Sequence, residues 1–298
     1  MKRILLFLAT NILVLLTLGI VSNLLCVFVL DTSLAELVGP DFAVLLVVAF
    51  VYGLVGAFIS LLLSKPIAKF ACGAKTIDGS EGPAERWLVD TVRLLAERAN
   101  VGMPEVAVYE GAPNAFATGA FRNRSLVAVS TGIMEQLTKE ELKAVLGHEL
   151  SHVANGDMVT MTLVQGVLNA FVIFLSRALA YVIASAGRGE GRRRGTSGLY
   201  YPLVFVFDLA LGVLASLLVF AYSRHREYRA DAGSANLLGS SAGMIAALRR
   251  LGNLKPGVLP DSLKAMGVAE GRRHASLWST HPSLEDRIAA LERWTMAV

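Results

Sequence analysis

Three side chains within residues 142–157 have the types and the spacing of a metal-dependent hydrolase. The stretch LKAVLGHELSHVANGD contains His148, Glu149 and His152 in the order H-E-x-x-H. In a helix, two histidines at positions i and i+4 project from one face, so that both imidazoles can bind one tetrahedral zinc ion. Glu149 then lies beside the ion, where it can take a proton from a zinc-bound water and pass it to a leaving amine. The pattern predicts a zinc hydrolase with Glu149 as the general base.

A third protein ligand has to come from elsewhere, because a catalytic zinc site has three protein ligands and one open position. The extended motif with a third histidine six residues after the second is excluded, since that position holds Met158. Further along, Glu227 and Asp231 lie four residues apart, on one face of a helix. This spacing favours Glu227 as the ligand and Asp231 as the acceptor that fixes a histidine tautomer. The alternative is a surface helix of salt bridges, because arginines alternate with these carboxylates.

Other histidines could also contribute a nitrogen, namely His225, His274 and His281. His281 precedes Pro282, which could open a helix at its first position, so His281 could be a simple helix cap. Alternatively, it could donate a hydrogen bond to the tetrahedral oxyanion, or occupy the open position of the metal in a resting state.

The helix that carries the motif has a clear start signal. Thr138 and Glu141 have the spacing of a capping box, in which each side chain binds the backbone of the other residue. An apolar face then follows, formed by Leu142, Val145, Leu146 and Leu150. Both features predict that the two histidines lie on a helix.

The region before this helix has the pattern of a small globular domain. It predicts a helix at 83–100, followed by short strands at 105–109, 115–119 and 125–130. One small, apolar segment precedes the motif and could be an edge strand that pairs with an extended peptide substrate. It contains the candidate substrate-binding residues Asn114, Ala115, Phe116, Ala117 and Thr118. An ordinary strand is the alternative.

The composition is that of a membrane protein. Only 17% of the 298 residues are charged, against about 25% in an ordinary soluble domain. Uncharged runs at 4–30 and 42–63 are each long enough to span a bilayer, and the first has neither the short core nor the cleavage site of a signal peptide. Lysines flank the pair and acidic residues lie between the two runs, which predicts that both outer ends are cytoplasmic. The net charge of +4 and the absence of basic-aromatic alternation argue against a nucleic-acid partner.

Two further apolar runs, at 158–187 and 199–222, each contain one charge, Arg177 and Asp208 respectively. A membrane-spanning hairpin would place the basic loop at 188–194 outside, against the positive-inside rule. Arg177 and Asp208 are about equally far from the middle of this loop, and so would lie at equal depth in the hairpin. Because intramembrane charges are rarely unpaired, we predict a contact between them.

The combination of motifs resembles one known family. In chain order the motifs are Asn114-Ala-Phe-Ala-Thr-Gly119, His148-Glu-Leu-Ser-His152 with Asn155-Gly-Asp157, Ser223-Arg-His-Arg-Glu227-Tyr-Arg-Ala-Asp231, and Thr280-His-Pro282. With the apolar runs, the chain closely resembles, over nearly its whole length, the bacterial and archaeal HtpX membrane proteases of the M48 metallopeptidase family. The resemblance implies one zinc ion per chain, bound by His148, His152 and Glu227, with Glu149 as general base and Asp231 in a supporting position.

We therefore predict an α+β, mostly helical integral membrane protein: a gluzincin-like zinc protease domain with a small β-sheet, plus four hydrophobic helices. The predicted parts are two N-terminal transmembrane helices (1–75), a cytoplasmic protease domain with the H-E-x-x-H helix (76–157), a hydrophobic hairpin (158–222), and a second part of the protease domain with the third ligand (223–298).

The resemblance also implies an activity and a location. The family's members are endopeptidases of the cytoplasmic (inner) membrane that face the cytoplasm. They cleave misfolded or damaged membrane proteins and unfolded polypeptides, and share this quality control with an ATP-dependent membrane protease. The alternatives are a CaaX-type protease for prenylated substrates, a non-catalytic zinc-stabilised scaffold or chaperone, and a transporter that uses Arg177 and Asp208.

Overall fold

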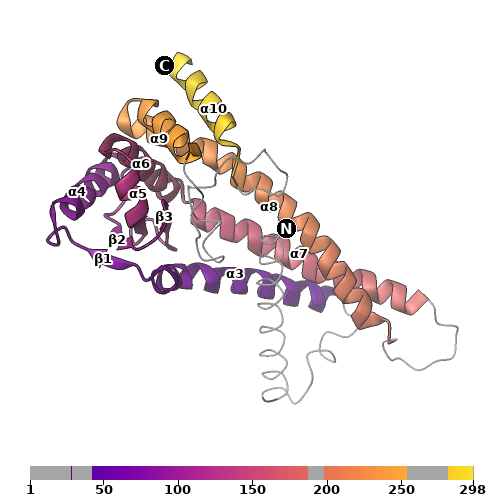
Figure 1. Ribbon diagram of the computed structural model, residues 1–298. Coiled ribbons are helices and arrows are strands. Elements are labelled where there is room, and N and C mark those ends of the chain that lie inside the picture. Colours follow the sequence, from indigo (N-terminus) through magenta and orange to yellow (C-terminus); the bar gives the residue numbers. More distant parts are fainter. Residues whose placement is uncertain (1–27, 29–41, 187–197, 254–280, 298) are drawn as a thin grey trace. The chain divides into compact units, whose positions relative to one another are not determined.

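The computed structural model describes residues 28, 42–186, 198–253 and 281–297, which belong to two compact units. The first unit is assigned residues 1–60 and 162–219, and the second residues 61–161 and 220–298. Three long helices contribute to both units: α3 (Phe42–Cys72), α7 (Asp157–Ala186) and α8 (Tyr200–Leu238) (Figure 1). The predicted span at 4–30 and the basic loop at 188–194 lie outside the described residues.

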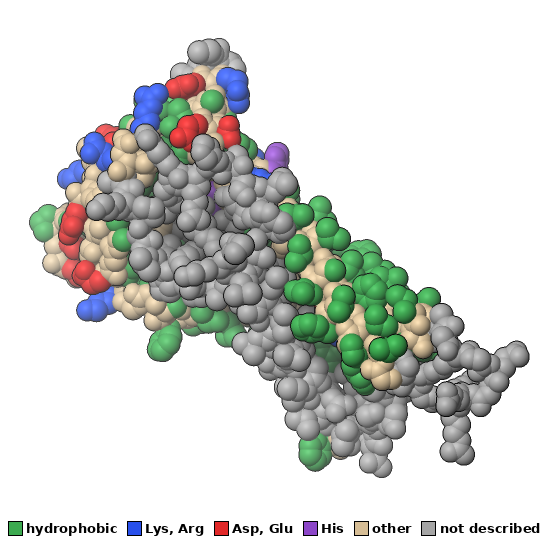
Figure 2. Space-filling model, turned by 45° about the vertical axis from the view of Figure 1, so that its right-hand side comes forward, with side chains coloured by type: hydrophobic (Ala, Val, Ile, Leu, Met, Phe, Trp, Pro, Cys, Tyr) green, Lys and Arg blue, Asp and Glu red, His purple; other side chains and the backbone are tan. Residues whose placement is uncertain are grey.

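The first unit is built from helices with a hydrophobic surface. Segments Val44–Cys72, Asp157–Ala184 and Tyr200–Leu238 are long and apolar enough to cross a membrane, with mean hydropathies between 2.0 and 2.6. Large apolar side chains such as Phe171, Phe205 and Leu218 are 60–64% exposed, and hydrophobic side chains cover the visible face of the long helices (Figure 2). Such a surface is suited to lipid rather than water. The predicted mostly helical membrane fold is confirmed.

An ion pair joins α7 and α8 within their apolar segments. Arg177 of α7 lies with its Nη1 atom 3.5 Å from Oδ1 of Asp208 on α8. The same guanidinium donates to the backbone oxygen of Ile173 at 3.0 Å. The predicted contact between the two intramembrane charges is confirmed, and the pairing lowers the cost of placing each charge in an apolar helix.

The second unit contains a four-stranded sheet with the order β1-β2-β4-β3. Its strands are β1 (Lys75–Ile77), β2 (Glu105–Tyr109), β3 (Ala115–Thr118) and β4 (Leu126–Ser130). Strands β2 and β4 are parallel, and the two outer strands pair in the antiparallel sense. The three predicted strands agree with β2, β3 and β4 to within one residue. The sequence does not predict strand β1, because three residues are too few to show an alternating pattern.

Helices cover both faces of this sheet. Helix α4 (Pro83–Arg98) and helix α6 (Lys139–Asn155) share one apolar core with Val106, Val127 and Val129 of the strands. On the other face, Ala68 of α3 packs against the remaining strand residues, and Lys65 and Lys69 both form ion pairs with Glu105 of β2. The helices α5 (Thr131–Gln136), α9 (Ala242–Asn253) and α10 (Leu284–Ala297) complete the unit.

Helix α6 carries the H-E-x-x-H motif and has a defined beginning and end. The predicted capping box is present: Thr138 accepts from the backbone of Glu141, and the Glu141 side chain accepts from the backbone of Thr138. The helix ends at Gly156, whose φ of 67° is left-handed and favours glycine. Helix α7 begins at the next residue, Asp157, so this turn directs the Asp157 side chain back toward α6.

Helix α8 crosses α6 at short range. The hydroxyl of Ser234 donates to the backbone oxygen of Ala144 at 2.7 Å. A Cβ atom at Gly147 would lie 2.9 Å from that hydroxyl oxygen, so only glycine fits without a shift. This close crossing brings Glu227, two turns before Ser234 on α8, to the histidine face of α6.

Helix α10 begins later than predicted. Its first residue is Leu284, and the Ser283 hydroxyl accepts from the backbone of Asp286, so Ser283 is the cap. Pro282 therefore lies outside the helix, and the interpretation of His281 as a simple helix cap is wrong. A serine three residues before an acidic residue is the stronger start signal.

Candidate metal centre

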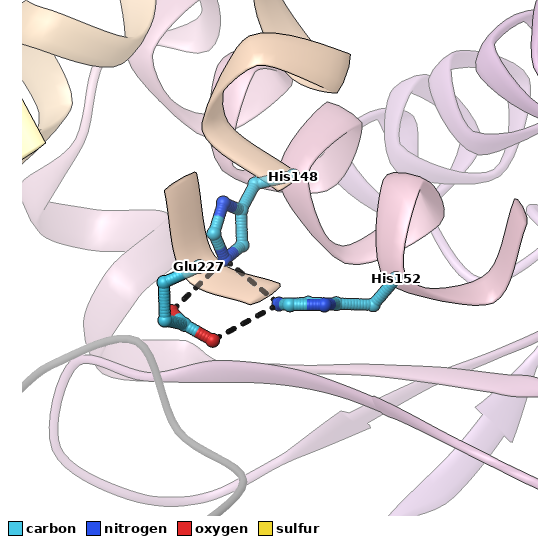
Figure 3. A group of neighbouring side chains, drawn as sticks. All are labelled: His148, His152 and Glu227. Carbon is cyan, nitrogen blue, oxygen red and sulfur yellow. Dashed lines mark hydrogen bonds and ion pairs between the residues drawn. The ribbon is translucent and has the colours of Figure 1, made fainter. Parts of the chain in front are cut away.

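Three side chains converge from two helices (Figure 3). His148 and His152 project from α6, and Glu227 from α8. The two Nε2 atoms lie 3.1 Å apart. Glu227 Oε2 lies 3.5 Å from His148 Nε2, and Glu227 Oε1 lies 3.3 Å from His152 Nε2. The three residues are at most 5% exposed.

Each histidine is held by a carboxylate on its other ring nitrogen. His148 Nδ1 lies 2.9 Å from Asp231 Oδ1, and His152 Nδ1 lies 2.6 Å from Asp157 Oδ2. A carboxylate can only accept, so each Nδ1 carries a hydrogen and donates it. In neutral imidazoles, both Nε2 atoms then present lone pairs to each other and to Glu227.

This arrangement fits a divalent metal ion. Two acceptor nitrogens and a carboxylate repel one another at such distances unless a cation lies between them. Ligands about 2.0–2.2 Å from a tetrahedral ion lie roughly 3.3–3.6 Å apart. The three observed separations, from 3.1 to 3.5 Å, are close to that geometry. Burial alone would lower the pKa of His148, but the Asp231 and Glu227 carboxylates raise it to about 9, because a proton on Nε2 can take the place of a metal ion beside Glu227. The acidic surroundings thus attract positive charge.

Glu149 joins this cluster to the sheet. Its side chain is 3% exposed, and its Oε2 atom accepts from the backbone N–H of Ala117 on β3 at 2.8 Å. Burial raises the pKa of Glu149, although the neighbouring histidines act in the opposite direction. The predicted general base therefore lies between the candidate ligands and an edge strand of the described sheet.

Comparison with known proteins identifies the family. Residues 83–295 match the sequence profile of Peptidase family M48. The chain belongs to this family. It is 54% identical to a protein of Verminephrobacter eiseniae over 98% of both chains, and 52% identical to one of Bordetella avium over 100% of both. Each of these relatives is described as a protease HtpX homolog.

A solved structure shares the fold. The crystal structure of S. mikatae Ste24p superimposes with a TM-score of 0.55 at 20% sequence identity. The match covers 87% of this chain and 63% of the Ste24p chain. At this identity, the likeness concerns the fold alone.

In this M48 chain the carboxylates of α8 are not on a surface. Glu227 is 1% exposed and Asp231 is 2% exposed, so the alternative of a solvated salt-bridge helix is wrong. Arg229 of the same helix turns to the Oδ1 atom of Asp157 at 3.1 Å. The i, i+4 spacing of Glu227 and Asp231 therefore correctly predicted that both carboxylates lie on one face of α8, and this face is buried.

Of the other candidate residues of this M48 chain, some contact Glu227 or Glu149 and others do not. His281 is 8% exposed, and its Nδ1 atom lies 2.9 Å from Glu227 Oε2. His225 is exposed, and His274 lies outside the described residues. Within the candidate substrate segment, the backbone N–H of Ala117 donates to Glu149. That segment, residues 114–118, is at most 2% exposed.

Two site residues were not assigned a role from the sequence. Asp157 belongs to the Asn155-Gly-Asp157 motif. Its position five residues after His152 is a signal that could have predicted it as the hydrogen-bond acceptor of that imidazole. Arg287 is fully buried, and its Nη2 atom lies 2.6 Å from Asp231 Oδ1. No local pattern indicates Arg287, because it is 139 residues from His148 in the chain.

Proposed function

We propose that this chain is a zinc-dependent endopeptidase of the membrane. One observation carries the proposal: the lone pairs of His148, His152 and Glu227 converge beside the buried carboxylate of Glu149. Two imidazoles and one carboxylate are a ligand set that zinc enzymes use for hydrolysis. The chain also belongs to a peptidase family, which supports peptide bonds as the target.

The chemistry follows from the positions of these side chains. When bound, zinc polarises the scissile carbonyl and acidifies a water molecule. Glu149 accepts the proton of that water and delivers it to the leaving nitrogen. The hydrogen bond from Ala117 holds the Glu149 carboxylate in one orientation for both transfers. His281, beside Glu227, would either donate a hydrogen bond to the oxyanion or serve as a further metal ligand in a resting state.

Strand β3 is the proposed binding edge for substrate. It is an outer strand of the described sheet, and its Ala117 backbone already contacts the general base. An extended peptide added to this edge would therefore lie along the catalytic carboxylate. Because residues 114–118 are almost fully buried, this binding requires the edge to be uncovered.

The proposed substrates are misfolded or damaged membrane proteins and unfolded polypeptides on the cytoplasmic side of the inner membrane. Only Gly156 separates α6 from α7, whose residues 157–184 form a candidate membrane span. Such continuity favours cleavage near the membrane surface. We further propose that this activity overlaps with that of an ATP-dependent membrane protease. A CaaX-type processing activity and a zinc-stabilised scaffold are the competing functions.

The test is proteolysis of casein by detergent-purified protein prepared without metal, with and without added zinc. We expect cleavage only with zinc, and a loss of about 10²–10⁴-fold in rate in Glu149→Gln, because general-base transfer contributes that much. Glu140→Gln is the matched control, since Glu140 is exposed on the same helix. Zinc bound by wild type without cleavage, and a Glu149→Gln variant that keeps the cellular role, would support a scaffold instead.

A further inference from the structure

Arg287 of α10 is a charged side chain in an unusual environment. It is 0% exposed and is the largest of the fully buried side chains among the described residues. A guanidinium is protonated at any ordinary pH and cannot lose its charge to reduce the cost of burial. Its position therefore has to be explained by its partners.

The first partner is Asp231 on α8, which Arg287 binds with two parallel hydrogen bonds. Arg287 Nε donates to Oδ2 at 2.8 Å, and Nη2 donates to Oδ1 at 2.6 Å. This paired geometry fixes both the position and the plane of the carboxylate, which a single hydrogen bond would leave free to rotate.

The fixed carboxylate in turn orients a candidate metal ligand. Asp231 Oδ1 accepts from Arg287 and also lies 2.9 Å from His148 Nδ1. Arg287 Nη2 is 3.4 Å from the same ring nitrogen, so the shorter Asp231 contact decides that Nδ1 is the donor. The lone pair of His148 is consequently on Nε2, which faces His152 and Glu227.

The second neighbour is Glu227. Arg287 Nη1 has no hydrogen-bond partner among the described side chains and lies 3.6 Å from Glu227 Oε2. One guanidinium thus lies against the carboxylate behind His148 and against the proposed third ligand. Its charge compensates the two buried negative charges of Asp231 and Glu227.

We propose that Arg287 is a positioning residue, which fixes Asp231 so that His148 presents Nε2 to the metal ion. The inference rests on the proposed metal site. It assigns a role in metal binding to the last helix of the chain, which supplies no ligand itself. A purely structural role, in which Arg287 only attaches α10 to α8, is the competing explanation.

The test uses the full-length protein in detergent and measures metal binding directly. Cobalt(II) is substituted for zinc, its visible absorption spectrum reports the ligand geometry, and competition with a chelator gives the affinity. In Arg287→Gln and Arg287→Lys we expect a 10- to 100-fold weaker affinity, as for other residues that orient metal ligands, together with a changed cobalt spectrum. Lysine keeps the charge but cannot form the paired hydrogen bonds. Arg293→Gln, on an exposed residue of the same helix, should match wild type.

Two results with the single variants would overturn the inference. One is a lower unfolding temperature in Arg287→Gln with the affinity and spectrum of wild type, which is the signature of a structural role. The other is wild-type cobalt binding by Arg287→Lys, because the geometry of the guanidinium would then be irrelevant. If Arg287→Gln does not fold, the double variant Arg287→Gln with Asp231→Asn removes the uncompensated charge, and wild-type binding by it would also refute the inference. Peptide cleavage is measured separately, so a wild-type protein that binds cobalt but does not cleave would reject the proposed function and not the role of Arg287.

Discussion

At the scale of single residues, each histidine of the site donates its Nδ1 hydrogen to a buried carboxylate. This contact determines which ring nitrogen carries the hydrogen. Asp157 is 0% exposed and accepts from His152, while its other oxygen accepts from Arg229 at 3.1 Å. Asp231 likewise accepts from a histidine and an arginine, but here His148 and Arg287 share its Oδ1 atom. Both histidines are thus oriented by a carboxylate that an arginine holds in turn. The two carboxylates come from different helices, α7 and α8, and each contacts the Nδ1 atom of its histidine.

Loss of the Asp157 acceptor should weaken metal binding without removing a ligand. In Asp157→Asn, the His152 ring loses a charged acceptor, and we expect the zinc affinity to fall about 10- to 100-fold. Chelator competition measures the change. Asp90→Asn is the control, since Asp90 is 59% exposed in its pair with Arg93. Equal affinities for the two variants would mean that Asp157 does not orient His152.

At the scale of elements, α6 is defined by its two ends. Thr138 and Glu141 begin it, and Gly156 ends it in a left-handed conformation. The same glycine determines where Asp157 lies relative to His152. A change at the helix end should therefore affect both the stability of the helix and the metal site.

Gly156→Ala tests this coupling. No atom lies within 4 Å of an added Cβ, so the cost is the left-handed backbone alone, about 1–2 kcal/mol for a non-glycine residue. Gly239→Ala has the same open surroundings and a φ of 71°, but it ends α8 away from the motif. We expect similar losses of unfolding free energy in both variants, and weaker zinc binding only in Gly156→Ala. Unchanged zinc binding in both variants would show that the conformation of the Gly156 turn does not affect the metal site.

The capping box predicts a dependence on pH. Burial raises the pKa of Glu141, but hydrogen bonds from the Thr138 backbone and from Arg250 outweigh it and hold the pKa below its usual value. A lowered pKa means that the ionised form stabilises the fold. This contribution is complete above the unfolded value of about 4.3 and is lost as the pH falls through the lower folded value.

Thermal unfolding in detergent at pH 7 and at successively lower pH measures this contribution. Glu141→Gln should be less stable than wild type by about 1 kcal/mol at pH 7, as for other lost helix caps. The difference should shrink in acid, because wild type then loses the same charge. A difference that stays constant with pH would assign the effect of the substitution to packing.

At the scale of the whole molecule, the apolar helices and the sheet domain have different requirements. The helices expose large hydrophobic side chains, and Arg177 and Asp208 form an ion pair between two of the described spans. The sheet domain has its own apolar cores on both faces of the strands. The protein therefore combines a part suited to lipid with a sheet domain that has apolar cores of its own.

Reversal of the membrane charges tests the pairing. Arg177→Asp and Asp208→Arg should each reduce the yield of folded, membrane-inserted protein, because each places two like charges together in an apolar helix bundle. The double reversal should recover much of that yield. A double variant as poor as the single variants would show that the contact has no role in folding.

The sequence by itself determined the features that depend on nearby residues. The spacing of His148 and His152, the capping box at Thr138 and the apolar runs are local patterns, because helix periodicity and hydrophobicity act over a few turns. The same holds for Glu227 and Asp231, whose i, i+4 spacing predicted a shared face. Those patterns that fall within the described residues each have a counterpart in the structure, whereas the apolar run at 4–30 lies outside them.

Only the tertiary structure decided which distant groups meet. Arg287 reaches Asp231 because α10 packs against α8 and α9, and His281 lies beside Glu227 for the same reason. Strand β1 exists through its pairing with β2, since three residues carry no pattern of their own. Contacts of this kind depend on which apolar faces pack together, and a linear sequence specifies that packing only through the whole fold. The three candidate ligands could therefore be predicted from the chain, whereas the arginine that contacts Asp231 and Glu227 could not.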